Sequence, residues 1–247
     1  MAVLEVKNIG KHFGSTNVLD DVSFTLEEGN ALAIIGSSGS GKTTLLRCLN
    51  FLETPDRGSI TVKGETLFDA DDPASGQGSN LRTKRLHFGM VFQAFHLFPQ
   101  YTALENVMLA EKLLAKERPD FKQKKKEIYE EIETHGKELL NRMGLSERME
   151  HYPHQLSGGQ QQRVAIARAI AQAPPIILAD EPTGNLDSGS SKEIMEILKS
   201  LHEEGRTVIL ITHDNEIAKQ AKRVIKIIDG EIVQDSGKEP GEIVEES

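Results

Sequence analysis

The chain of 247 residues has no long apolar segment and no excess of basic residues. No segment approaches the roughly 18 consecutive apolar residues that a membrane-spanning helix needs, and the N-terminus lacks the charged and then apolar pattern of a signal peptide. We therefore expect the protein to stay in the cytoplasm. The 38 aspartate and glutamate residues outnumber the 29 lysine and arginine residues, which gives a formal net charge of -9. A general nucleic-acid binder shows the opposite balance, so we expect no nucleic-acid partner.

Cysteine occurs only once, at Cys48, and the chain has no internal repeat or low-complexity tract. Cys48 lies in the apolar segment 44–49, where a cysteine is more often a small buried residue than a reactive thiol. The length is sufficient to bury a sizeable core. We therefore expect residues 1–247 to form one domain with a helical insertion.

Residues Gly36–Thr43 read GSSGSGKT, which fits the pattern G-x-x-x-x-G-K-[ST]. An apolar segment, 31–35, precedes them and a helical pattern follows, which is the strand, loop and helix context of a phosphate-binding loop. A glycine-rich turn without a ligand is the alternative. Glycines let the loop amides approach an anion, Lys42 would reach the β- and γ-phosphates of ATP, and Thr43 would bind Mg²⁺. The expected ATP ligands here are Gly36, Ser37, Ser38, Gly39, Ser40, Gly41, Lys42, Thr43 and Thr44.

A second apolar segment, 176–179, ends in Asp180 and Glu181. It predicts a buried parallel strand that carries two carboxylates to the C-terminal edge of the sheet, where ligands of open α/β sheets bind. Asp180 would then hold Mg²⁺ through water, and Glu181 would polarise the attacking water or accept its proton. Without the phosphate loop, a solvated turn or a helix N-cap would be the simpler interpretation.

The sequence LSGGQ at Leu156–Gln160 precedes a helical pattern whose N-terminus can face an anion. A Ser-Gly-Gly helix cap without a ligand is the alternative. With the phosphate loop and the carboxylates in this order, residues 3–235 resemble the ATP-binding-cassette (ABC) ATPases. The resemblance implies a P-loop NTPase (RecA-like) α/β core with an antiparallel β subdomain and an α-helical subdomain inserted at about residues 94–172.

The resemblance also implies that two copies share each ATP. In the family, cassettes pair head to tail in an ATP-dependent dimer. The LSGGQ segment of one copy, here Leu156–Gln160 and called the signature segment below, closes over the γ-phosphate bound by the other. Ser157, Gly158, Gly159 and Gln160 would thus contact the ATP of a second copy. Asp187, in the sequence Asn-Leu-Asp, would lie in a loop that crosses the dimer interface, although an ordinary turn before a helix is the alternative.

Three further positions match functional positions of the family. Gln93 corresponds to the glutamine that contacts Mg²⁺ and the attacking water and senses the membrane partner. His213 corresponds to the switch histidine near the γ-phosphate, although a lone histidine is more often structural. Phe13 takes the place of the aromatic that stacks on adenine, commonly a tyrosine, and a packing role stays open. The expected catalytic residues are Glu181, His213, Gln93 and Lys42, and the expected metal ligands are Thr43, Gln93 and Asp180.

The segments between these motifs carry weaker patterns. Alternation predicts strands at Leu4–Ile9, Leu19–Leu26 and Ser59–Gly64. The polar segment Asp69–Thr83 predicts an exposed loop, and Lys238–Ser247 predicts a frayed tail.

Residues 119–143 predict an amphipathic helix, and the lysines at 124–126 predict a solvated face in preference to a phospholipid contact. A Thr-x-x-Glu helix start at Thr102 follows the aromatic segment 94–101, which in the family docks a membrane subunit. Its four large side chains could equally belong to the core: Phe95, Leu97, Phe98 and Tyr101.

The subfamily signals conflict. Leu46–Glu53 and Val91–Val107 look like the ATPase subunits of polar-amino-acid importers, whereas Asp180–Ser188 is closer to the lipoprotein-release, macrolide-export and cell-division group. We give more weight to the first two segments because they are longer and one lies where the membrane partner docks. We therefore expect an ATPase on the cytoplasmic face of the cell membrane, bound to a permease and energising import with an extracellular solute-binding protein. A soluble ABC protein of DNA repair or translation is a further alternative, but it would normally carry two cassettes or a long coiled-coil arm.

Overall fold

The computed structural model describes residues 2–72 and 81–237, which divide into two compact units. Unit 1 takes the chain up to Phe88, Pro175–Glu181 and the residues from Leu201 onward. Unit 2 takes Gly89–Pro174 and Pro182–Ser200, so residues 94–172, the range predicted for a helical subdomain, all fall within it together with a later segment. Strand β6 (Phe88–Val91) passes from unit 1 into unit 2, and helix α6 (Ser188–Glu203) passes back.

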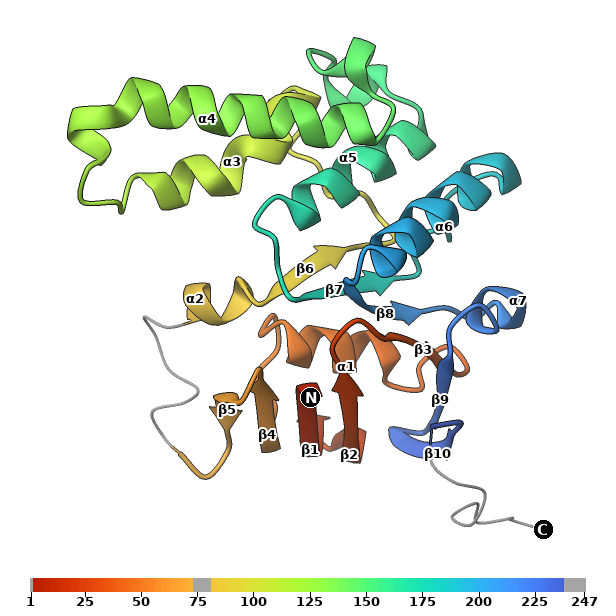
Figure 1. Cartoon of the computed structure of the whole chain (residues 1–247). Helices are drawn as coiled ribbons and strands as arrows, with labels where there is room; N and C mark the ends of the chain where they lie inside the picture. Colours follow the sequence, from red (N-terminus) through yellow and green to blue (C-terminus); the bar gives the residue numbers. More distant parts are fainter. Residues whose placement is uncertain (1, 73–80, 238–247) are drawn as a thin grey trace. The chain divides into compact units, whose positions relative to one another are not determined.

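Unit 1 contains the predicted antiparallel sheet, with strand order β2-β1-β4-β5 (Figure 1). Its strands are β1 (Ala2–Phe13), β2 (Thr16–Glu27), β4 (Arg57–Val62) and β5 (Glu65–Asp69). Alternate side chains of β1 and β2, such as Leu4, Leu19 and Leu26, are fully buried, as expected for a sheet with one covered face. Both strands are longer than their apolar patterns because irregular register, with Asn8 at φ 52°, lets the pairing continue past each break.

The strands of the second sheet that belong wholly to unit 1 have the order β10-β9-β3-β8-β7. Strands β3 (Ala31–Ile35), β7 (Ile176–Asp180), β8 (Thr207–Ile211) and β9 (Arg223–Ile228) pair in parallel, and β10 (Glu231–Asp235) is an antiparallel edge strand. Every residue of β7 and β8 is buried, which explains why both read as continuous apolar runs. The parallel pairing brings the carboxyl ends of β3, β7 and β8 to one edge, where the candidate site lies.

Helix α1 (Lys42–Leu49) follows β3 and buries Leu45, Leu46, Cys48 and Leu49. Cys48 has no exposed surface, and its burial raises the pKa of the thiol to about 12. The prediction that Cys48 is a buried apolar residue is therefore confirmed.

We expect Cys48 to react with an aromatic disulfide reagent about 1000-fold more slowly in the folded protein than in the urea-unfolded chain. The thiolate is the reactive form, and a pKa near 12 leaves little of it at neutral pH, whereas an exposed thiol has a pKa near 8.5. The release of the coloured thiolate measures the rate, and a Cys48→Ala variant should release none because the chain has no other cysteine. Equal rates in the folded and unfolded protein would contradict the burial.

Unit 2 is largely helical, with α3 (Ala103–Ala115), α4 (Phe121–Arg142), α5 (Gly158–Ile170) and most of α6, up to Ser200. Helices α3 and α4 lie side by side, and a Cβ on Gly136 of α4 would come within 2.9 Å of Met108, so this glycine allows the close approach. Thr102 and Glu105 form the predicted capping box at the start of α3. The short elements of the chain are α2 (Leu81–Arg85), α7 (Asn215–Ala218) and the 3-10 turns Ser146–Arg148 and Pro153–Gln155.

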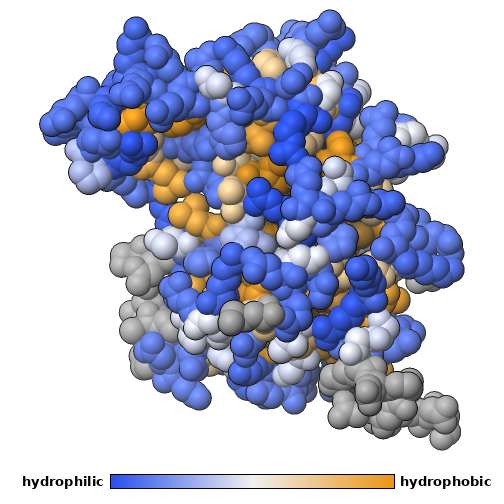
Figure 2. Space-filling model, in the orientation of Figure 1, coloured by the Kyte–Doolittle hydropathy of each residue, from blue (hydrophilic) through white to orange (hydrophobic). Residues whose placement is uncertain are grey.

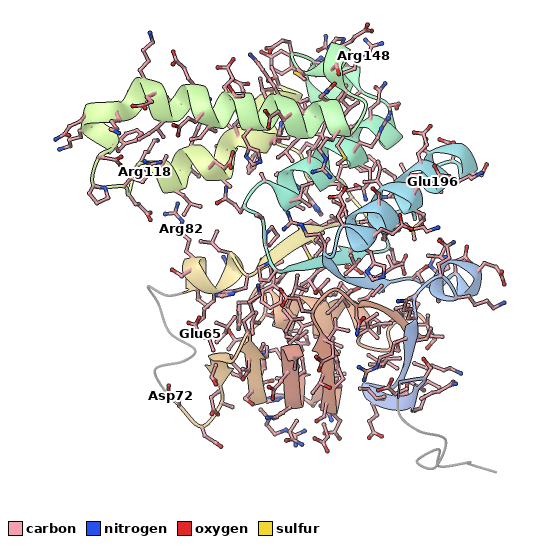
Figure 3. All side chains as sticks on the ribbon, in the orientation of Figure 1. Glu65, Asp72, Arg82, Arg118, Arg148 and Glu196 are labelled. Atoms are coloured by element: carbon pink, nitrogen blue, oxygen red, sulfur yellow. The ribbon has the colours of Figure 1, made fainter. Side chains whose placement is uncertain are left out.

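Two details differ from the sequence-based expectations. The helix predicted at 119–143 begins at Phe121 and is interrupted at Lys124, which has φ -114° and ψ 21°. An ion pair of Arg118 with Asp120, 2.9 Å long, lies in the turn before it, where Arg118 is labelled in Figure 3. The last residues of the predicted loop Asp69–Thr83 are helical, because α2 begins at Leu81. Its residues 73–80 and the predicted tail, Lys238–Ser247, lie outside the described residues.

The visible surface of α4 is mainly hydrophilic in Figure 2, and the lysines at 124–126 are exposed, in agreement with a solvated face. The aromatic segment 94–101 is not core: Phe98 is exposed, and Phe95, Leu97 and Tyr101 are only partly covered. In residues 2–72 and 81–237, no helix is long and apolar enough to cross a membrane.

Candidate nucleotide site

The phosphate loop of unit 1 connects β3 to α1, as its sequence predicts. Gly39 and Gly41 have φ of 82° and 98°, which other residues rarely adopt. A Cβ on Gly41 would lie 2.6 Å from the carbonyl oxygen of Val18 in β2, so only glycine lets the loop pass this close. Gly41 is the N-cap of α1, and no side chain caps the helix. The N–H groups of the first turn are therefore available to an anion.

Lys42 is a buried ammonium group, with 6% of its surface exposed. Its Nζ donates hydrogen bonds to the carbonyl oxygens of Gly36, at 2.9 Å, and Ser37, at 2.7 Å. Burial lowers the pKa of Lys42, and the charges of Glu181 and Asp180 oppose that shift. Within the described part of the chain, Lys42 forms no ion pair. A buried cation held by neutral oxygens, at an uncapped helix N-terminus, fits a phosphate group.

Thr43 and Asp180 come together although 137 positions separate them. The hydroxyl of Thr43 donates to Oδ1 of Asp180 at 3.2 Å. Asp180 ends β7 and is 9% exposed, and burial raises the pKa of its carboxyl group while the Thr43 hydrogen bond lowers it. A hydroxyl and a carboxylate are oxygen ligands of the kind that Mg²⁺ prefers. The pair fits a Mg²⁺ ion, whose charge would also favour the ionised form of Asp180.

Glu181 and His213 meet at the same edge of the sheet. Oε2 of Glu181 lies 3.3 Å from Nδ1 of His213, and the Glu181 N–H donates to the carbonyl oxygen of Ile211 at 3.0 Å. The contact follows from the parallel register of β7 and β8, which places Asp180 beside Ile211. Glu181 also has φ 44°, an unusual backbone for a residue other than glycine, and such strain concentrates at functional sites.

Phe13 ends β1 in unit 1, and 47% of its surface is exposed. The Lys11 ammonium lies 5.2 Å from the centre of its ring. A ring this exposed contributes little to a core, so its position favours stacking on a ligand over packing.

In unit 2, the signature segment forms the N-terminus of α5. Ser157 is the N-cap: its hydroxyl accepts from the Gln160 N–H at 3.3 Å, and Oε1 of Gln160 accepts from the Ser157 N–H at 3.0 Å. A Cβ on Gly159 would lie 2.7 Å from the hydroxyl of Ser190 in α6. The helix-cap interpretation thus describes part of what these residues do, and the remaining N–H groups of the first turn can still bind an anion.

Gln93 and Asp187 lie in unit 2 with the signature segment. Gln93 is exposed, its carbonyl oxygen accepts from Nδ2 of Asn185 at 3.1 Å, and a Cβ on Gly184 would come within 2.6 Å of its amide nitrogen. Asp187 accepts from the N–H of Ser190 at 2.9 Å and from its hydroxyl at 2.8 Å. These hydrogen bonds lower the pKa of Asp187, which makes it a charged cap at the start of α6.

Sequence reasoning missed two polar residues of α5 that bind backbone carbonyls. Gln162 donates to the carbonyl oxygens of Phe92 and Pro182, and Arg168 donates to those of Phe95 and His96. Burial lowers the pKa of Arg168. The position of Gln162 in the helix could have indicated that it is buried. It lies four residues before Ile166, on the same apolar face of α5.

Comparison with known protein families matches residues 19–184 to the family described as ABC transporter. The chain belongs to the ABC transporter family. It is an ABC transporter ATPase subunit, and the predicted family and fold class are confirmed. The family binds ATP, in agreement with the phosphate-binding character of the loop at Lys42.

Three relatives cover almost all of this ABC ATPase. An uncharacterized ABC transporter ATP-binding protein, MJ1508 of Methanocaldococcus jannaschii, is 45% identical over 94% of the chain and 98% of its own length. The arginine transport ATP-binding protein ArtM of Bacillus subtilis is 44% identical over 94% of the chain and 90% of its own length. The macrolide export ATP-binding/permease protein MacB 1 of Yersinia pestis is 43% identical over 96% of the chain, but the chain spans only 34% of it.

The solved structure of the ATP-binding cassette MJ0796, described as dimeric, in a post-hydrolysis state and bound to ADP and Pi, has a TM-score of 0.78 and 39% identity. The match covers 94% of this ABC ATPase and 97% of that chain. It agrees with the assignment of the present chain as an ATPase.

Proposed function

We propose that the protein hydrolyses MgATP at two composite sites of a homodimer and thereby drives a membrane permease from the cytoplasmic face. The observation that carries the proposal is the buried ammonium of Lys42, which lies at an uncapped helix N-terminus next to the Thr43 and Asp180 oxygens. Phosphoryl transfer needs positioning and charge neutralisation more than covalent chemistry, and this set of groups supplies both.

Each residue of the proposed site has its own role in hydrolysis. Thr43 and Asp180 would hold Mg²⁺, which would supply positive charge to the β- and γ-phosphates. Gln93 of unit 2 is proposed as a further Mg²⁺ ligand only because it matches the glutamine of the family. Lys42 and the loop amides bind the phosphates, and Glu181 orients the attacking water and accepts its proton. His213, next to Glu181, stabilises charge at the γ-phosphate. Phe13 stacks on the adenine.

The second half of each site comes from the other copy. Ser157, Gly158, Gly159 and Gln160 close over the γ-phosphate bound by the partner, and Asp187 lies at the same interface. The dimeric relative MJ0796 supports this assembly. The N–H groups in the first turn of α5 that Ser157 does not cap can bind an anion, which supports contact between the signature segment and a phosphate.

Mixing two inactive variants tests the shared sites. Lys42→Ala removes the ammonium group of the phosphate loop, and Ser157→Asp places a carboxylate in the signature segment. Each variant alone should therefore have little ATPase activity. In a two-fold dimer, a mixed pair keeps one intact site, and equal mixing should restore about a quarter of the wild-type rate. Phosphate release measures it, and a mixture as inactive as its components would reject composite sites.

A matched pair of variants at Ser157 separates helix capping from anion binding. Asparagine and aspartate both cap helices well, so Ser157→Asn and Ser157→Asp should unfold at similar temperatures. Only aspartate places a carboxylate where the γ-phosphate of the partner would bind, and we expect its ATP turnover to be at least about 10-fold below that of the asparagine variant. Equal turnover of the two variants would leave Ser157 as a helix cap alone.

For the transported solute, we propose import of polar amino acids. The support is the relative ArtM, which the chain matches over 90% of its length, together with the importer-like segments Leu46–Glu53 and Val91–Val107. The second candidate is export or lipoprotein release. It is favoured by Asp180–Ser188 and by MacB, of which the chain spans about a third.

Purification of the membrane complex distinguishes the two. The tagged Glu181→Gln variant, extracted with ATP from membranes of the source cell, should bring a permease that also binds an extracellular solute-binding protein. Polar amino acids added with that binding protein should then stimulate the ATPase activity of the reconstituted wild-type complex. A permease that functions without a solute-binding protein would instead favour the export alternative.

A further inference from the structure

Gln162 is a fully buried amide in α5 of unit 2, on the side of the helix that otherwise buries Ile166 and Ala169. Its Nε2 donates two hydrogen bonds, to the carbonyl oxygen of Phe92 at 3.0 Å and to that of Pro182 at 2.8 Å. Because both neighbours are carbonyl oxygens, only the NH₂ end of the amide can face them, and the orientation of the side chain is fixed. One side chain therefore holds two segments that lie 90 positions apart in the sequence.

These two segments carry residues of the proposed mechanism. Phe92 precedes Gln93, and Pro182 follows Glu181. A further bond in unit 2, from Nδ2 of Asn185 to the carbonyl oxygen of Gln93 at 3.1 Å, joins the same two segments to each other. The backbone at Phe92, next to Gln93, and the backbone at Pro182, next to Glu181, are thus held by one amide of α5, the helix that begins in the signature segment.

Stabilisation of the fold alone does not explain a glutamine at position 162. Its Oε1 is buried and has no hydrogen-bond partner among the described residues. A buried acceptor without a partner is destabilising, and an apolar side chain of the same shape would avoid that cost. A glutamine is needed here only if the two carbonyl groups must be held in place.

We infer that Gln162 is a positioning residue for ATP hydrolysis: its amide fixes the backbone at Phe92 and Pro182, which are the chain neighbours of Gln93 and Glu181. The inference rests on the proposed roles of those two residues. Arg168, about two turns further along α5, extends the same device, because its guanidinium donates to the carbonyl oxygens of Phe95 and His96. The signature helix thus holds the segment after β6 at two points.

Gln162→Met tests the inference, because methionine keeps the length of the side chain and removes both donors. The phosphate loop belongs to unit 1, so the KM for ATP should stay within about threefold, while kcat should fall at least about 10-fold. Gln123→Met is the matched control: Gln123 is an exposed glutamine of α4 in the same unit, and kcat should stay within about twofold of wild type. Hydrogen exchange should become faster in residues 92–97 and 182–187 and stay unchanged in residues 36–49.

A second variant, Gln162→Glu, keeps the shape and places acceptors against both carbonyls. A buried carboxyl group is readily protonated, and its O–H could then donate to one carbonyl. We therefore expect the ratio of its kcat to that of wild type to rise as the pH falls from 8.5 to 6.5, which a merely structural role would not produce.

Three results would overturn the inference: a wild-type kcat for Gln162→Met, a parallel loss of ATP binding and thermal stability in that variant, or a flat pH ratio for Gln162→Glu. If Glu181→Gln keeps normal turnover, the proposed mechanism fails first. If Glu181→Gln is inactive while Gln162→Met is normal, only the positioning role fails.

Discussion

The Glu181→Gln variant is expected to bind ATP as the wild type does and to hydrolyse it at least about 100-fold more slowly, the usual effect of losing a general base. Glutamine has the shape of glutamate and can still accept hydrogen bonds, but it cannot take the proton of the attacking water. The substitution should not change the backbone strain at φ 44°, because glutamine and glutamate are equally unfavourable at positive φ. Since ATP is bound but not cleaved, the ATP-dependent dimer should accumulate.

Three measurements check this expectation. Phosphate release gives the turnover, a fluorescent ATP analogue gives the affinity, and size-exclusion chromatography with light scattering, run with ATP, gives the oligomeric state. Glu196→Gln is the matched control, because Glu196 is an exposed residue of α6 that points into solvent (Figure 3). Near-normal phosphate release by Glu181→Gln would remove Glu181 from the role of base.

Lys42→Ala is expected to abolish measurable nucleotide binding. The side chain is the one buried cation of the phosphate loop, and its Nζ also ties the loop together through the carbonyl oxygens of Gly36 and Ser37. Charge-assisted contacts to phosphate are strong in a buried site, so we expect the affinity to fall at least about 100-fold. Titration calorimetry with ATP and Mg²⁺ measures the loss.

Two controls separate charge from packing at Lys42. Lys42→Met keeps an unbranched, buried stem and should bind ATP as poorly as Lys42→Ala, which would assign the loss to the ammonium group. Lys192→Ala removes an exposed lysine of α6 and should bind normally. Unchanged ATP affinity in Lys42→Met would show that the charge is not what holds the phosphates.

The features that were predictable from sequence are local ones. The strand, loop and helix around Lys42 are contiguous, and the capping boxes at Thr102 and Ser157 join residues three positions apart. The buried strands β7 and β8 were visible as short apolar runs because both of their faces are covered.

The features that could not be predicted depend on irregular backbone or on distant partners. The interruption of α4 at Lys124 has no signal in the lysine-rich sequence around it. The full length of β1 depends on register shifts that the apolar pattern does not show. The buried amide of Gln162 looked like one polar residue among several at the start of a helix, since its partners are the carbonyl oxygens of remote segments.

The sequence by itself determined the chemistry of this ABC ATPase, because a phosphate-binding loop needs only glycines, a lysine and a helix N-terminus in consecutive positions. The tertiary structure decided which side chains meet. The register of β7 and β8 brings Glu181 to His213, the sheet brings Asp180 to Thr43, and the fold of unit 2 brings Gln162 to Phe92 and Pro182. The physical reason is that a motif fixes groups joined by a few bonds, whereas contacts between remote segments form only when strands and helices pack.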